Sequence, residues 1–118
     1  MTTLIRIAIA ATKIEEMRRF YNLVFEANFE VQATDMGNFY QGQLAGFALT
    51  LVPNTVAKVV AEQNRQQLSL LVDNIEVILS KAEQAGGKRL GEVLTGPAGR
   101  QAAIIDPDGN TIELLQQA

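Results

Sequence analysis

The chain has 118 residues, of which 47% are hydrophobic, and a formal net charge of −3, as expected for one globular domain and not for a disordered chain. It contains neither cysteine nor histidine, which excludes disulfides, thiolate chemistry and imidazole-based catalysis or metal binding. Acidic and basic residues are interspersed, so we expect no nucleic-acid partner. No apolar stretch approaches the roughly 20 residues of a membrane span, and the N-terminus lacks signal-peptide features. We therefore expect a cytoplasmic protein with no membrane partner.

The first half of the chain predicts a strand, a helix and three further strands. Residues 4–11 are apolar apart from Arg6 and form the first strand. Residues 12–15 match a capping box, and apolar residues at helical spacing, Tyr21 among them, predict a helix that buries this stripe and ends near Glu26. Alternating runs separated by turn residues predict a meander of three strands at 29–33, 39–43 and 47–52.

The second half repeats this order. An apolar strand at 68–72 precedes a second capping box at 73–76, and the helix that follows should end at Gly86 and Gly87. Proline and glycine at 106–109 predict a tight turn before the final strand, and the glycine-bearing segment 96–100 is interpreted as a hairpin connection. The three strands of this half are expected at 90–94, 101–105 and 111–115.

The two halves align with each other at nearly constant offsets. Ile14 and Ile75 lie 61 residues apart, and late in each half Leu49 and Ile112 lie 63 residues apart. A repeat of about sixty residues predicts one supersecondary unit used twice. We therefore predict an α+β fold of two βαβββ modules, at about 1–54 and about 66–118. The linker, at about 55–65, fits either a helical turn on a sheet or a lid.

Two segments resemble a known family. They are the helical run Phe-Tyr-Asn-Leu-Val-Phe at 20–25 and the terminal run Asp-Pro-Asp-Gly-Asn-Thr-Ile-Glu-Leu at 106–114. Together they are similar to the vicinal-oxygen-chelate superfamily, which includes glyoxalase, bleomycin-resistance and extradiol dioxygenase proteins. The resemblance covers essentially the whole chain. It implies a single domain, 1–118, whose two βαβββ modules form half-barrel sheets, and a homodimer in which a partner covers an open sheet edge.

The resemblance also implies where a site lies. In the family's enzymes, the start of the first strand and the middle of the last strand of each half hold a divalent cation. By the family motif and the two offsets, these positions are Arg6, Thr50, Gln67 and Glu113. Glu113 suits a metal and Gln67 is a neutral donor, but Thr50 is a poor ligand and Arg6 repels a dication. We therefore predict a site with no metal and no cofactor.

The same positions leave two interpretations open. Arg6 either pairs with Glu113 in the half-barrel or binds a carboxylate or phosphate of a ligand, oriented by Gln67 and Thr50. The aromatic side chains of the middle strands either pack in the core or stack on a planar ligand; they are Phe39, Tyr40 and Phe47.

The preferred function is a metal-free protein that sequesters or carries a small organic, anionic ligand in the half-barrel cavity. The alternative is a divergent glyoxalase-like lyase or isomerase, with Glu113 as general base and Arg6 stabilising an enolate or carboxylate. A third hypothesis is a structural or regulatory dimer whose cavity is filled by its own side chains. Dioxygenase chemistry is disfavoured because its facial triad needs two histidines.

Overall fold

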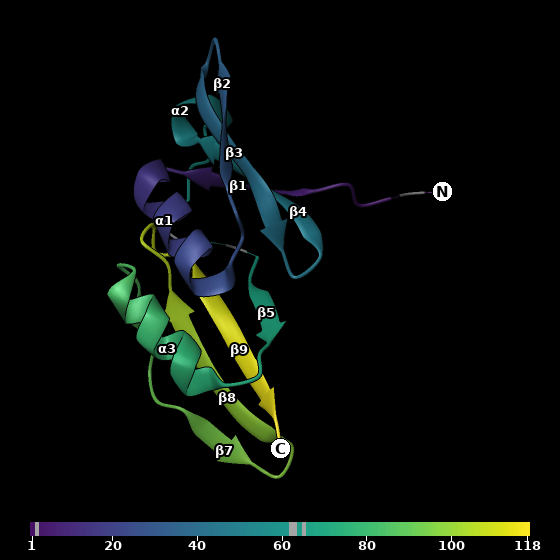
Figure 1. The fold of residues 1–118 in the computed structure, drawn as a ribbon, viewed down its shortest axis with the longest axis vertical. Helices are drawn as coiled ribbons and strands as arrows, with labels where there is room; N and C mark the ends of the chain where they lie inside the picture. The colour runs from purple at the N-terminus through teal and green to yellow at the C-terminus, as the bar shows by residue number, and fades with distance from the viewer. Residues whose placement is uncertain (2, 62–63, 65) are drawn as a thin grey trace. The chain divides into compact units, whose positions relative to one another are not determined.

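The computed structural model describes residues 1, 3–61, 64 and 66–118, and these form two compact units, Met1–Val60 and Ala61–Ala118 (Figure 1). Each unit contains one open sheet with a helix packed against it. This arrangement confirms the predicted α+β class with two open half-barrel sheets. Of the helices in the described ranges, none is long and apolar enough to cross a membrane.

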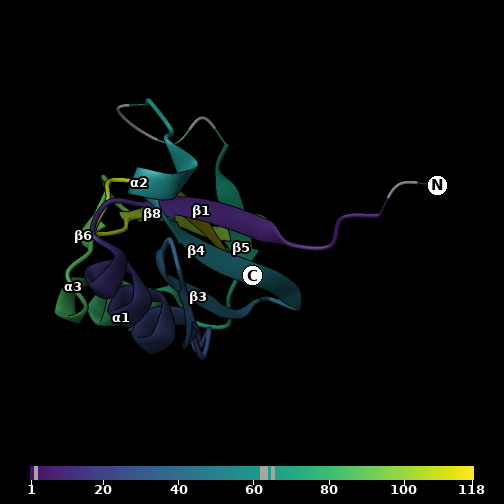
Figure 2. The same cartoon turned by 90° about the horizontal axis from the view of Figure 1, so that it is seen from above.

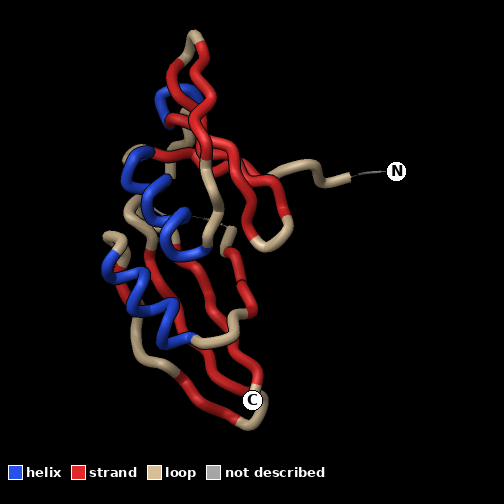
Figure 3. Tube along the Cα trace, viewed as in Figure 1, coloured by secondary structure: helices blue, strands red, loops and turns tan. Residues whose placement is uncertain are grey.

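The first unit has the predicted βαβββ order. Its first strand runs parallel to the last, and the remaining neighbours are antiparallel, in the spatial order β1-β4-β3-β2. Figure 3 shows β2 and β3 as two long strands joined by a short turn. The elements are β1 (Ile7–Ala11), α1 (Ile14–Phe25), β2 (Glu30–Thr34), β3 (Gly37–Leu44), β4 (Phe47–Pro53) and the single-turn helix α2 (Asn54–Ala57).

The core of this unit lies between α1 and the sheet. Met17, Phe20 and Tyr21 are at most 1% exposed, and the ring of Tyr21 stands edge-on to that of Phe29. Burial of each large apolar side chain contributes about 1.5–3 kcal/mol. The helix ends where predicted, because Glu26 takes the left-handed conformation at φ 54° and donates its backbone N–H to the Asn22 carbonyl. The core position of Tyr21 is thus confirmed.

Two local predictions in this unit need correction. The strand predicted at 4–11 is paired only from Ile7, opposite Leu49, so Leu4 and Ile5 remain exposed. The α1 helix begins one residue later than the capping box predicted, with Lys13 at the N-cap. The Glu15 carboxylate accepts from Tyr40 and Arg18.

The start of the predicted linker adopts the helical turn, one of the two structures that fit its sequence. The α2 helix follows β4 directly and packs on β1 and β4 (Figure 2). The Asn54 side chain closes the turn by accepting from the Val59 N–H at 3.0 Å and donating to the Val59 carbonyl at 3.2 Å.

The second unit repeats the topology with one change. Its sheet has the order β5-β9-β8-β6, with β7 also paired to β8, and β5 runs parallel to β9. The elements are β5 (Leu68–Leu71), α3 (Ile75–Gln84), β6 (Lys88–Arg89), β7 (Leu94–Gly96), β8 (Gly99–Ile105) and β9 (Thr111–Gln117).

The α3 helix again begins one residue later than its predicted capping box. Asn74 is the N-cap, and its side chain accepts from the Val77 N–H at 3.3 Å. The predicted end at the glycine pair is confirmed, since Gly86 has φ 89° and Gly87 donates to the Ala82 carbonyl at 2.8 Å. Ile75, Leu79 and Ala82 bury the apolar stripe.

The strand register confirms the internal repeat residue by residue. In the first unit Ile7 lies opposite Leu49, and in the second Leu68 lies opposite Ile112. The first members of these pairs are 61 residues apart and the second members 63, the two offsets found in the sequence. The sequence repeat is therefore a repeat of strand pairing.

The strand predicted at 90–94 is wrong, because the chain breaks there into β6 and β7. Five residue steps lead from Arg89 to Leu94, but only three lead between their partners Ile104 and Gln101, so two extra residues bulge out. Gly91 takes φ 74° within this bulge, a conformation that interrupts an extended strand.

Candidate functional site

One face of the second sheet is the candidate site. The α3 helix packs on β8 and β9 (Figure 1), and residues that face it, such as Ile104 and Leu114, are fully buried. Side chains alternate along a strand, so the intervening residues lie on the opposite face, which we call the open face. The open face includes Ser69, Leu71, Lys88, Leu94, Gln101, Ala103, Ile105, Thr111, Glu113 and Leu115.

Glu113 is fixed at the middle of the open face by two neighbouring strands. Its Oε1 accepts from the Ser69 hydroxyl at 2.8 Å, and its Oε2 accepts from the Gln101 side-chain amide at 2.9 Å. Ser69 lies directly opposite Glu113 in the parallel ladder, and Gln101 lies one diagonal step away on β8. Because each oxygen has a donor, the half-buried carboxylate is held in one orientation.

Gln67 lies on the same side of the sheet as Glu113 but binds a different residue. It precedes β5 by one position, is exposed, and donates its side-chain amide to the Thr111 hydroxyl at 2.9 Å. Asn64 accepts from the Thr111 backbone N–H at 3.1 Å. Gln67 and Asn64 thus fasten the beginning of β9, two residues before Glu113.

The remaining predicted positions belong to the first unit. Thr50 is 7% exposed and lies between Ala8 and Gln41 in the sheet register. Arg6 is exposed and stands two residues before Ala8, at the entrance to β1. Arg6 and Glu113 belong to different units, so their predicted pairing stays a prediction.

The three predicted aromatic residues have separate environments. Tyr40 is buried at 5% exposure, which confirms its place in the core. Phe39 is half-buried and shares the face of Thr50, because Gln41 lies opposite Thr50 and Phe39 is two residues earlier. Phe47 is 50% exposed. It lies on the sheet face opposite to Thr50, because it is three residues earlier on the same strand and side chains alternate along a strand. Phe39 and Phe47 therefore do not line one surface.

The donor set does not fit a divalent cation. Among the four predicted positions only Glu113 carries a carboxylate, and Arg6 offers nitrogen donors without a lone pair to coordinate a metal. The groups around Glu113 are the neutral side chains of Ser69 and Gln101. Across the described residues no three Asp or Glu side chains gather closely enough to hold a metal ion.

Ser69 and Gln101 are site residues that the sequence analysis missed. Ser69 interrupts the predicted apolar strand Leu-Ser-Leu-Leu of β5, and Gln101 is the first residue of the predicted strand 101–105. The sequence signal is therefore present for Ser69 and weak for Gln101. Assigning both side chains to Glu113 also requires the register between strands, which hydrophobic pattern alone does not supply.

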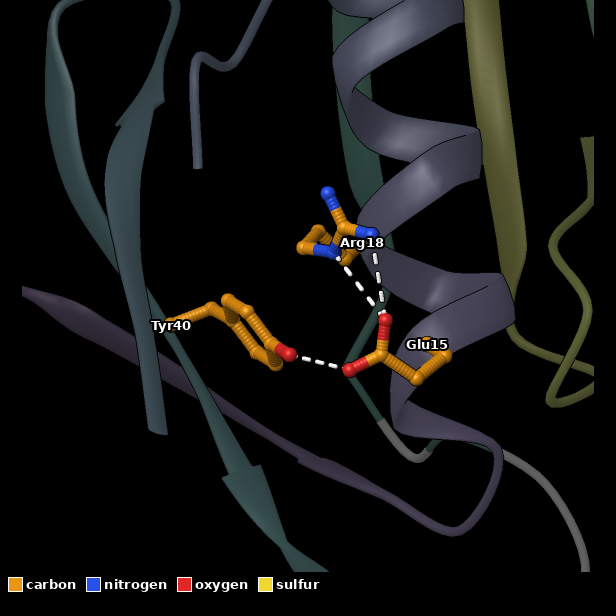
Figure 4. A network of polar contacts seen from close by, with 3 residues as sticks. All are labelled: Glu15, Arg18 and Tyr40. Carbon is orange, nitrogen blue, oxygen red and sulfur yellow. Dashed lines mark hydrogen bonds and ion pairs between the residues drawn. The ribbon is translucent and has the colours of Figure 1, made fainter. Parts of the chain in front are cut away.

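A second polar cluster lies in the first unit, where α1 meets β3 (Figure 4). The Tyr40 hydroxyl donates to one oxygen of Glu15, and Arg18 contacts the other at 3.1 Å. The Arg18 guanidinium also lies 5.4 Å from the centre of the Tyr40 ring, within cation–π range. This cluster ties the first turn of α1 to the sheet.

The cluster shifts two pKa values in opposite directions. The hydrogen bond from Tyr40, followed by Arg18, lowers the pKa of Glu15 below its ordinary 4.5, against partial desolvation, which raises it. The hydrogen bond to Glu15, followed by burial, raises the pKa of Tyr40 above 10.0. Stability from Glu15 is therefore present above about pH 4.5 and lost as pH falls through the lowered pKa. Stability from Tyr40 is present below about pH 10 and lost as pH rises through the raised pKa.

Tyr40→Phe should move the pKa of Glu15 upward, toward 4.5, because the largest cause of its depression is removed. The pKa is measured from the side-chain carboxyl carbon of Glu15 by NMR titration. The acid limb of the stability curve should become shallower in the same variant. An unchanged Glu15 titration would contradict the assignment.

Comparisons with known proteins agree on the fold. A family model described as a glyoxalase-like domain matches residues 6–115. A glyoxalase-related enzyme from Fulvimarina pelagi is 19% identical, with 99% of this chain and 89% of that chain covered and a TM-score of 0.79. An antibiotic-binding protein from Streptomyces sp. CB03234 is 24% identical, with coverage of 100% and 98% and a TM-score of 0.68. A fosfomycin resistance protein from Mesorhizobium loti is 14% identical, with coverage of 100% and 94% and a TM-score of 0.76. No curated protein matches the chain.

Proposed function

Since this chain belongs to the glyoxalase-like domain family, we propose that it binds a small organic molecule on the open face of its second sheet, without a metal ion. The observation that carries this proposal is the fixed carboxylate of Glu113, held by Ser69 and Gln101 on a surface of exposed leucines. A few placed polar groups among apolar side chains are the usual composition of a small-molecule site. The predicted cytoplasmic homodimer remains part of this proposal.

The fold supports the same class of function. It is shared with an antibiotic-binding protein and with a fosfomycin resistance protein. One fold hosts several chemistries, so the donor set at Glu113 supports binding more directly than the likeness does. The family's metal chemistry needs ligands that Arg6 and Thr50 do not supply.

The test is thermal unfolding of EDTA-treated protein against aromatic amines, aromatic acids and planar antibiotics. A compound that binds the native state at about 100 times its Kd should raise the midpoint by roughly 5–10 °C. The rise should be lost in Glu113→Gln. It should persist in Glu92→Gln, which makes the same charge change at an exposed residue of the bulge.

Two other results would contradict the proposal. A rise seen only with a divalent cation, and lost in Glu113→Gln, would restore a metal site. NMR would also detect conversion of the bound compound to a new species. If Glu113→Gln abolished that conversion, the result would favour the lyase or isomerase with Glu113 as general base.

A further inference from the structure

A strip of leucines crosses the open face beside Glu113. Leu71 lies opposite Leu115, Leu115 opposite Gln101, and Gln101 opposite Leu94, so these side chains form one row across four strands. Leu71 and Leu94 are 65% and 63% exposed, and Leu115 is 37% exposed. Three large aliphatic side chains in one exposed row are an apolar surface that can hold a hydrocarbon group.

Glu113 supplies the charge of this surface, and its partners do not neutralise it. Its two hydrogen-bond donors, Ser69 and Gln101, are uncharged, and none of the ion pairs within the described ranges includes Glu113. Lys88 lies on the same face but two strands away, roughly 10 Å at ordinary strand spacing, a distance at which salt screens exposed charges. A half-buried carboxylate at the edge of an apolar strip is complementary to a cation.

We infer that the open face binds an amphipathic organic cation, with its ammonium or amidinium group on Glu113 and its apolar body along the leucine strip. This inference rests on the proposed function and names the class of ligand. A carboxylate has about four lone-pair positions, of which Ser69 and Gln101 use two, so acceptor capacity remains. Because those two residues already fix the carboxylate, little ordering accompanies binding. An organic anion would instead be repelled by the negative charge of Glu113.

The experiment uses three probes with one skeleton and different charge: phenylbutylamine, phenylbutanol and phenylbutyrate. Each is titrated at pH 7 into the full-length protein, and the methyl signals of Leu71, Leu94 and Leu115 are followed by NMR. The amine should bind at least about tenfold more tightly than the carboxylate, since a charge-assisted hydrogen bond replaces a repulsion. Glu113→Gln should remove this preference, and Glu92→Gln should retain it. Leu94→Ser should weaken all three probes to a similar extent.

Other outcomes overturn the inference in distinguishable ways. If phenylbutyrate shifts the same methyl signals as strongly as the amine, the ligand class is wrong while the proposed binding function stands. If no probe shifts them and no compound raises the unfolding midpoint, both the inference and the proposed function fail. Methyl shifts that depend on protein concentration without a probe would mean that a second copy covers the face. Tighter amine binding in Arg6→Ala would mean that Arg6 is the native partner of Glu113.

Discussion

Gly99→Ala should lower the free energy of unfolding by about 3 kcal/mol. Gly99 begins β8 at φ 135°, a left-handed conformation in which a side chain is strained by about 1–3 kcal/mol. A β-carbon there would lie 2.0 Å from the Gln116 carbonyl oxygen and 2.9 Å from the Ala118 nitrogen, both backbone atoms. Since the backbone of β9 has to move to admit the methyl group, overpacking adds about 1–3 kcal/mol. Urea denaturation of the two proteins measures the loss.

Gly96→Ala is the matched control, because Gly96 lies directly opposite Gly99 across the same hairpin. A β-carbon at Gly96 meets no heavy atom within 4 Å, and Gly96 is not among the positive-φ glycines. Alanine there should leave stability within about 0.5 kcal/mol or increase it slightly, because it restricts the unfolded chain. Equal losses in the two variants would show that the hairpin rejects any side chain and would contradict the steric argument.

Asp106→Ala should cost about 2–3 kcal/mol, because it removes the acceptor that organises the turn between β8 and β9. Asp106 is 3% exposed. Its carboxylate accepts from the Asp108 N–H at 3.0 Å, the Asn110 N–H at 2.9 Å and the Asn110 side-chain amide at 2.8 Å. Alanine leaves these donors without their acceptor, and each unsatisfied buried donor costs about 1–3 kcal/mol, reduced here by access to water. Urea denaturation gives the stability change.

Asp106→Asn keeps the volume of the side chain but removes its negative charge and one acceptor oxygen. The amide keeps one oxygen for the backbone N–H groups but places a second donor against the Asn110 amide, so an intermediate loss is expected. Amide hydrogen exchange at Asp108 and Asn110 should accelerate most in the alanine variant. A loss as large in the asparagine variant as in the alanine variant would mean that the negative charge, and not the set of hydrogen bonds, stabilises the turn.

Much of the fold could be predicted because its signals are local. Periodic apolar residues define α1 and α3, and the glycine pair ends α3. The offsets of 61 and 63 showed that the second half repeats the first, and the strand pairs Ile7–Leu49 and Leu68–Ile112 differ by the same two offsets. The capping box at 12–15 placed the start of α1 one residue too early, and it gave no sign of Tyr40, 25 residues away in sequence, which donates to the Glu15 carboxylate. A local sequence motif does not reveal a hydrogen-bond partner that is distant in sequence and comes close only in the folded protein.

The candidate site was predicted only in part, for the same reason. The family resemblance of the terminal motif marked Glu113, and its carboxylate lies on the open face. The offset of 61 then gave Gln67 as a further position. The residue directly beside Glu113 is instead Ser69 on β5, two positions after Gln67. Selecting Ser69 and Gln101 requires knowing which residues of three strands lie side by side, and that follows from the ladder and not from any single segment.

The two extra residues between β6 and β7 have a consequence for the protein's behaviour at high concentration. An outer strand offers unpaired backbone groups to other chains, and a long, flat one invites aggregation. In the second unit the bulge divides that outer strand into segments of two and three residues, too short to template a growing sheet. The first unit has β2 at the corresponding position, five residues without a break and all exposed. Of the two strands at this position, β2 is therefore the one more open to pairing with another chain during refolding.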